Sequence, residues 1–107
     1  MKIAVIGAGA IGGLVGAKLA LAGEDVTFIV RGKNLDAIAT NGFKLIGADG
    51  TEQVALNAKA TDRYDQAGPQ DVVILAMKAH QVEAVANDVP KLFGPETVVV
   101  TMQNGIP

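Results

Sequence analysis

Five of the 13 glycines of this 107-residue chain lie within ten residues near its N-terminus. Three of them form a G-x-G-x-x-G motif between an apolar run and an Ala- and Leu-rich segment. The first glycine of such a motif permits a tight turn, the second lets the backbone approach a pyrophosphate, and the third lets a helix pack closely on a strand. Free N–H groups and the positive end of the helix dipole then attract the phosphates. The motif predicts a dinucleotide-binding segment made of Gly7, Ala8, Gly9, Ala10, Ile11 and Gly12. The alternative is that these glycines only permit close packing of an apolar helix.

Arg31 lies 19 residues beyond Gly12, where a second predicted strand ends, and Lys33 follows closely. A site for NAD(H) has Asp or Glu at this position, because a carboxylate accepts hydrogen bonds from the hydroxyls of the adenosine ribose. A carboxylate would repel the additional 2′-phosphate of NADP(H), whereas a guanidinium binds it through paired, charge-assisted hydrogen bonds. Arg31 therefore favours NADPH or NADP⁺ as the cofactor. The alternative is an exposed surface arginine.

Two further polar segments follow predicted strands. Lys78 and Gln81 come after one apolar strand, and Asn104 comes after the next. Ligands of open α/β sheets bind beyond the carboxyl ends of the strands, so these residues are expected to face the same crevice as the glycine motif. Lys78 would add a cation near the phosphates or the adenosine, and Asn104 an amide near the nicotinamide. The alternatives are a solvated lysine and an Asn-Gly turn, and His80 fits a surface residue better than a catalytic acid.

The elements that must position these residues begin with a strand, a helix and a second strand. Ile3–Ile6 is a continuous apolar run of the kind found in parallel strands that are buried on both faces. Ala10–Ala22 is long enough for a helix of about three and a half turns, which Gly23 would end. Val26–Val30 is rich in β-branched residues and predicts the second strand. Together they predict a right-handed βαβ unit.

The rest of the chain predicts a doubly wound α/β sheet of the Rossmann type, mostly parallel, with a β-hairpin insertion. The Asp-Gly of residues 47–50 between two apolar segments favours the hairpin. The predicted elements are a helix over Leu35–Thr40 capped by Asn34, hairpin strands over Phe43–Ile46 and Gln53–Leu56, an irregular connection or short helix over Asn57–Gln70, a buried strand over Asp71–Met77, a helix from His80 to about Phe93, and a buried strand over Thr97–Thr101.

Composition excludes several classes of protein. The 9 basic and 11 acidic residues are dispersed along the chain, so neither nucleic acid nor a membrane surface is an expected partner. The hydrophobic content of 50% excludes intrinsic disorder. The chain has no cysteine and a single histidine, so no metal site is expected. The uncharged run from Ile3 to Ala17 is too short to span a membrane, and Lys18 makes it a poor signal peptide, so a cytoplasmic location is the default expectation.

Four segments together resemble the N-terminal domain of the ketopantoate reductase (2-dehydropantoate 2-reductase) family. They are the N-terminal M-K-I-A-V-I-G-A-G-A-I-G, Arg31, the Lys78–Gln81 segment K-A-H-Q, and the Gln103–Gly105 segment Q-N-G. The last two, at these distances, are more specific than the glycine motif. The resemblance covers essentially the whole chain. It implies reduction of 2-dehydropantoate to pantoate with NADPH, in pantothenate and coenzyme A biosynthesis.

The resemblance also implies roles for single residues. The Gly7–Gly12 loop would bind the pyrophosphate, Arg31 the 2′-phosphate, and Lys78 and Asn104 further parts of the cofactor, with Asn104 nearest the substrate. The catalytic lysine of the family belongs to a helical C-terminal domain, so residues 1–107 are expected to be the NADP-binding domain of a longer protein. This chain is therefore expected to hold no catalytic residue and to bind NADPH without turnover. The expected partners are a small 2-oxo acid and a second copy, bound through that other domain or by self-association.

Two other functions stay open at this point. A regulatory domain that senses NAD(H) uses the same glycine loop, although it usually keeps an acid where this chain has Arg31. Another reductase of the same fold would act on a different 2-oxo acid, a sugar acid or a glycerol phosphate.

Overall fold

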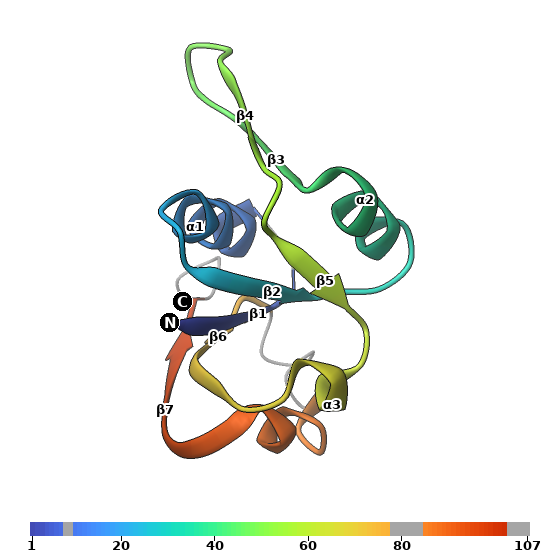
Figure 1. Cartoon of the computed structure of the whole chain (residues 1–107), viewed down its shortest axis with the longest axis vertical. Coiled ribbons are helices and arrows are strands. Elements are labelled where there is room, and N and C mark those ends of the chain that lie inside the picture. The colour runs from blue at the N-terminus through green and yellow to red at the C-terminus, as the bar shows by residue number, and fades with distance from the viewer. Residues whose placement is uncertain (8–9, 78–84, 103–107) are drawn as a thin grey trace, which may run out of the picture.

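The computed structural model describes residues 1–7, 10–77 and 85–102, and it contains a five-stranded parallel sheet in the order β5-β2-β1-β6-β7. The strands are β1 (Lys2–Ile6), β2 (Asp25–Ile29), β5 (Lys59–Thr61), β6 (Gln70–Leu75) and β7 (Phe93–Thr101). The chain starts in the middle of the sheet, builds β2 and β5 on one side, and then crosses to β6 and β7 on the other (Figure 1). This order, with every pair parallel, confirms the predicted Rossmann-type α/β class.

The sheet is covered on both faces, which explains why its central strands are apolar without interruption. Helices α1 (Ala10–Leu21) and α2 (Lys33–Asn41) lie on one face, and α3 (Tyr64–Ala67) with the short 3₁₀ helix η1 (Val89–Leu92) lies on the other (Figure 1). Ile3 and Val5 of β1 join the core cluster under α1, whereas Ala4 and Ile6 join the cluster under η1. Side chains of a strand alternate between the two faces of the sheet, so alternate residues of β1 fill different cores.

The predicted hairpin is present and projects away from the sheet (Figure 1). Its strands, β3 (Phe43–Ile46) and β4 (Glu52–Ala55), pair antiparallel across a turn at residues 47–50. Gly50 adopts a φ of 86°, and the Asp49 carboxylate accepts a hydrogen bond of 3.0 Å from the Thr51 N–H. At the base of the hairpin the Phe43 ring stacks on Phe28 of β2, with ring centroids 4.8 Å apart. This stacking attaches the base of the hairpin to the main core.

Two predictions for the middle of the chain were wrong. Asn34 does not cap α2, because the helix already begins at Lys33 and Gly32 is the N-cap residue. Gly32 has a φ of 66°, which lets the chain turn into the helix, and its carbonyl accepts the Asp36 N–H. The stretch Asn57–Gln70, predicted as an irregular connection or a short helix, does contain the short helix α3, but the prediction missed β5, which pairs parallel with β2 at the edge of the sheet. This strand has only three residues and no run of apolar side chains, so no hydrophobic period signalled it.

The prediction for the last helix and strand also needs correction. The start of the helix expected from His80 lies outside the described residues, and its end does not reach Phe93. From Val85 the chain passes through a turn into η1, whose first turn holds Pro90, because proline fits a helix start and not its interior. β7 then begins at Phe93 and is not buried: Val98 is 57% exposed. Among the described residues β7 pairs only with β6, so it is an edge strand, and its residues Val99 and Val100 are exposed as well.

An ion pair joins β5 to β2 at the edge of the sheet, between Lys59 Nζ and Asp25 Oδ1. The hydrogen bond from Lys59 is the main reason that the pKa of Asp25 lies below its ordinary value. A carboxyl whose pKa falls on folding stabilises the protein above its unfolded pKa and loses this contribution as the pH falls through the folded pKa. Both side chains are largely exposed, so the contribution is about 0.5 kcal/mol.

We expect Asp25→Asn to lower the free energy of unfolding by about 0.5 kcal/mol at pH 7 and to have no effect near pH 2. The measurement is urea unfolding of both proteins at the two pH values. The control is Glu52→Gln, which removes one carboxylate from another exposed ion pair, that of Lys44 and Glu52 on the hairpin. A difference between Asp25→Asn and the parent that is equal at both pH values would contradict the role of the charge.

Candidate functional site

Gly7 makes the turn that the motif predicts at the end of β1. Its φ is 92°, a conformation that favours glycine, and its N–H donates a hydrogen bond of 3.1 Å to the Ile29 carbonyl of β2. A Cβ on Gly7 would lie 2.9 Å from the backbone oxygen of Ala76, which follows β6. Three neighbouring strand ends therefore meet at this turn, and only a residue without a side chain fits among them.

Gly12 brings α1 against the sheet. A Cβ at this position would lie 2.2 Å from the Cβ of Ala76 and 3.5 Å from Val5 Cγ1, so the helix could not approach this closely with any other residue. This is the geometry expected for the third glycine of the motif. The later glycines have a different partner: Cβ atoms on Gly13 and Gly16 would each come within 2.6 Å of an aromatic ring, that of Phe43 or that of Phe28 respectively. Close helix packing is thus the role of these two.

The remaining residues of the motif are described only in part. Ala8 and Gly9 lie outside the described residues. Ala10 begins α1 and Ile11 follows it, so the first turn of the helix starts three residues after Gly7. The first turn of an α-helix has N–H groups without a partner in the helix and carries the positive end of its dipole. This end of α1 can therefore attract an anion at the carboxyl edge of the sheet.

A cavity of about 580 Å³ opens at the same edge. The ends of β1 and β2 form its floor, with Gly7 on one strand and Arg31 on the other. The segment 62–65 after β5 also lines it, together with Met77, Val85, Asp88 and Lys91. Asn34 of α2 also lines it. The structure thus brings Gly7 and Arg31, both predicted from the sequence, into one cavity.

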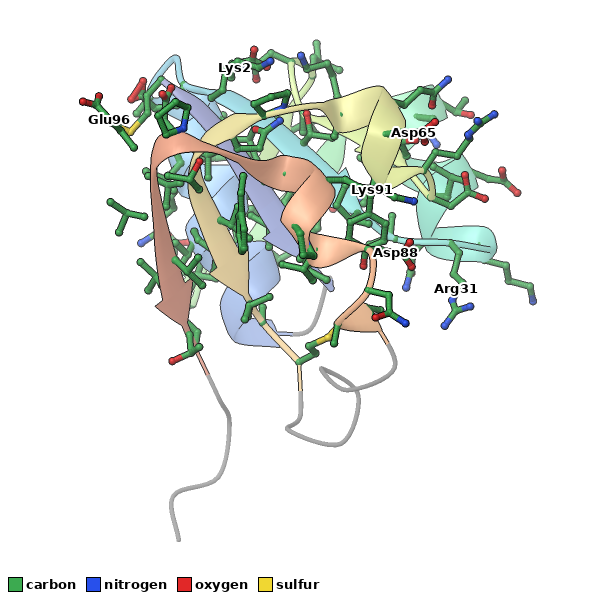
Figure 2. All side chains as sticks on the ribbon, turned by 90° about the horizontal axis from the view of Figure 1, so that it is seen from below. Lys2, Arg31, Asp65, Asp88, Lys91 and Glu96 are labelled. Carbon is green, nitrogen blue, oxygen red and sulfur yellow. The ribbon has the colours of Figure 1, made fainter. Side chains whose placement is uncertain are left out.

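Arg31 differs from the other cations of the cavity. Lys91 Nζ lies 3.1 Å from Asp88 Oδ1, and Arg63 Nη2 lies 3.2 Å from Asp65 Oδ2. Within residues 1–7, 10–77 and 85–102, no carboxylate forms an ion pair with Arg31. Its side chain is exposed and extends from the end of β2 on the side of the molecule where Asp88 and Lys91 lie (Figure 2). A guanidinium in this position is available to an anionic ligand.

Tyr64 is a cavity residue that the sequence did not reveal. It begins α3, in the stretch predicted as an irregular connection or a short helix, and its half-buried ring packs against the cluster under η1. Burial raises the pKa of its phenol, the nearby Asp88 raises it further, and Arg31 acts in the opposite direction. The phenol is thus neutral at physiological pH and can donate a hydrogen bond. A lone tyrosine in a segment without periodicity gave no signal of this position.

Several predicted site residues fall on segments that the structure does not describe. Lys78, His80, Gln81 and Asn104 lie outside the described residues. Their neighbours Met77 and Met102 are described: Met77 lines the cavity, and the Met102 N–H donates to the Leu75 carbonyl, which continues the pairing of β7 with β6.

The sequence profile of the family described as Ketopantoate reductase PanE/ApbA matches residues 3–107. The chain belongs to this family. A 2-dehydropantoate 2-reductase from Mesorhizobium japonicum is 47% identical over 108 residues, which cover 100% of this chain and 32% of the relative. A 2-dehydropantoate 2-reductase from Geobacter metallireducens GS-15 superimposes with a TM-score of 0.87 at 32% identity, covering 100% of this chain and 35% of that one.

The fold is also shared with a dehydrogenase. The ternary structure of D-mandelate dehydrogenase with NADH and anilino(oxo)acetate has a TM-score of 0.83 at 29% identity, and the match covers 100% of this chain and 35% of that one. This ketopantoate reductase family chain spans about a third of the length of the curated relatives it matches. In the part of the chain that the structure describes, no helix has the length and apolar character needed to span a membrane.

Proposed function

We propose that this chain binds NADP(H) and is the cofactor-binding part of an oxidoreductase that reduces 2-dehydropantoate to pantoate. The observation that carries the proposal is that Gly7 and Arg31 line the same cavity. The turn at Gly7 lies just before the start of α1, where a pyrophosphate would bind, and the exposed Arg31 is placed for the 2′-phosphate. The names of the relatives, 2-dehydropantoate 2-reductases, support the choice of substrate.

The fit of NADP(H) to this site depends on space and on charge. The strand ends leave no space for a Cβ at Gly7, so the backbone itself faces the cavity there. Arg31 lies just beyond the end of β2, where an NAD site would have a carboxylate. For the positions outside the described residues, the proposal follows the family motif: Gly9 at the pyrophosphate, Lys78 and Gln81 along the cofactor, and Asn104 near the nicotinamide and the substrate.

Bound NADPH would supply a hydride for the carbonyl carbon of a small 2-oxo acid. The residues of this chain would bind and orient the cofactor, since its described part offers no nucleophile–base pair at the cavity. We assign proton donation to the lysine that the family resemblance places in a helical C-terminal domain. The chain would then bind NADPH without oxidising it when 2-dehydropantoate is added. A second copy of the protein would bind through the same C-terminal domain.

A second candidate is an NADH-dependent reductase of another 2-oxo acid. It is favoured by the likeness to D-mandelate dehydrogenase, which was solved with NADH. Arg31 argues against it, because a guanidinium gains a dianionic partner only from a 2′-phosphate.

Calorimetric titration of the chain with NADPH and with NADH at one salt concentration tests both candidates. We expect NADPH to bind about tenfold more tightly or better, because one well-placed charge-assisted contact is worth about 1.5–3 kcal/mol. Equal or tighter binding of NADH would favour the second candidate or a regulatory NAD(H) sensor. The absence of binding by either cofactor would contradict the proposed function.

A further inference from the structure

Arg63 follows β5 in the same way that Arg31 follows β2. The two strands pair in register up to Ile29 and Thr61, and the Val30 N–H extends the pairing with a hydrogen bond of 3.0 Å to the Thr61 carbonyl. Each arginine is the second residue beyond the last registered pair. Neighbouring strands lie about 4.8 Å apart, so the two arginines leave the sheet side by side. Both of them line the cavity.

The backbone at Arg63 is held by its own segment. The Arg63 N–H donates to Thr61 Oγ1 at 3.1 Å, and the Thr61 hydroxyl donates to Gln66 Oε1 at 2.8 Å. The Arg63 carbonyl accepts the N–H groups of Gln66 and Ala67 at the start of α3. The start of the side chain is therefore fixed at the cavity, while the side chain itself is 65% exposed and can reorient.

Asp65 forms an ion pair with Arg63, and this ion pair is weak. One contact of 3.2 Å joins Nη2 to Oδ2, and both side chains are more than half exposed. Arg63 keeps the pKa of the Asp65 carboxyl below its ordinary value, chiefly through this hydrogen bond. An exposed pair of this kind contributes little to stability, and a guanidinium carries further N–H donors besides the one in this contact. A dianionic phosphate can displace a single carboxylate contact because it offers more charge and more acceptor oxygens.

The charge of the cavity requires a second cation near Arg31. Asp62, Asp65 and Asp88 also line the cavity, so a 2′-phosphate held by Arg31 alone would face several carboxylates. Lys91 of η1 also lines the cavity and lies close enough to Asp65 to lower the pKa of that carboxyl, but its Nζ is paired with Asp88 (Figure 2). Arg63 follows β5, the strand that pairs with β2, just as Arg31 follows β2.

We propose that Arg63 is the second arginine of the 2′-phosphate site and that Asp65 competes with the phosphate for it. The inference rests on the proposed binding of NADP(H) and adds a residue that determines the preference for the phosphorylated cofactor. On binding, Arg63 exchanges the Asp65 contact for the phosphomonoester on the 2′-oxygen of the adenosine ribose. Arg31 and Arg63 then hold this group from two neighbouring strand ends.

The test uses adenosine 2′,5′-bisphosphate and adenosine 5′-monophosphate, which differ only in the 2′-phosphate and need only the adenosine end of the site. We expect Arg63→Ala to weaken binding of the bisphosphate about tenfold and to leave binding of the monophosphate within about twofold. Arg63→Lys should fall between parent and Arg63→Ala, because an ammonium keeps the charge without the bidentate geometry. The matched control is Lys44→Ala, which removes an equally exposed, paired cation from the hairpin and should change neither affinity.

Asp65→Asn gives a prediction of the opposite sign. Removing the competing carboxylate should tighten binding of the bisphosphate about two- to threefold, and this gain should vanish in the Arg63→Ala background. If the parent discriminates between the two nucleotides but Arg63→Ala does so equally well, the role of Arg63 is wrong and the proposed function stands. If the parent shows no preference for the bisphosphate, the assignment of NADP(H) fails and this inference fails with it.

Discussion

Arg31→Asp is expected to weaken NADPH binding by about 100-fold or more and to change NADH binding by less than about threefold. The substitution removes a charge-assisted, bidentate contact, worth about 1.5–3 kcal/mol, and adds a carboxylate that repels the 2′-phosphate. The same carboxylate can accept hydrogen bonds from the ribose hydroxyls of NADH, as at the end of the second strand in NAD sites. Calorimetric titration of parent and variant with both cofactors at one salt concentration measures the two affinities.

Lys33→Asp is the matched control for Arg31→Asp. Lys33 is also exposed and lies two residues further along, at the start of α2, but it does not line the cavity. The two substitutions change the net charge equally, so a general electrostatic effect would appear in both. Equal losses of NADPH and NADH affinity in Arg31→Asp would show that the 2′-phosphate assignment is wrong.

Gly12→Ala is expected to lower the free energy of unfolding by about 2–3 kcal/mol. The added methyl would lie 2.2 Å from the Cβ of Ala76, and both atoms are attached directly to the backbone, so neither can rotate away. Either α1 or the segment after β6 must move, which also disturbs the turn at Gly7. Urea unfolding of parent and variant measures the loss, and cofactor titration shows whether the turn has changed.

A compensating substitution separates this clash from the intrinsic effect of alanine. Ala76→Gly removes the atom that the new methyl would meet, so the double variant with Gly12→Ala should recover more than half of the lost stability. Gly94→Ala serves as the control, because its Cβ would meet other atoms only at 3.6 Å or more. Additive losses in the double variant would mean that Gly12 is required for another reason.

The sequence predicted those parts of the fold that leave a periodic or conformational signal. β1 and β6 were predicted because strands buried on both faces are apolar without interruption. β5 was missed because an edge strand of three residues needs no apolar pattern, being held by its pairing to β2. The burial of β7 was predicted wrongly because the exposure of a strand depends on what packs over it, and this information lies outside its own residues.

The residues of the candidate site also divide into those that the local sequence predicted and those that it did not. Gly7 and Arg31 were found because a strand end followed by glycine or by a lone cation has a specific meaning in this fold. Arg63 and Tyr64 were not found, since their place at the cavity depends on the pairing of β5 with β2 and on the short helix that follows. Local sequence could not reveal a neighbour that only the strand order brings close.

The order of the strands also bears on how fast this chain can fold. The centre of the sheet pairs Ile3 of β1 with Val72 of β6, and the Lys2 N–H donates to Asp71 across a separation of 69 residues. Much of the hydrophobic core therefore forms only after most of the chain has closed into a loop. Parallel pairing of such distant segments raises the contact order, and proteins with high contact order fold slowly. The βαβ unit of β1, α1 and β2 is the part of this architecture with local contacts. Its early formation would reduce the number of conformations that the rest of the chain must sample before β6 and β7 pair with it.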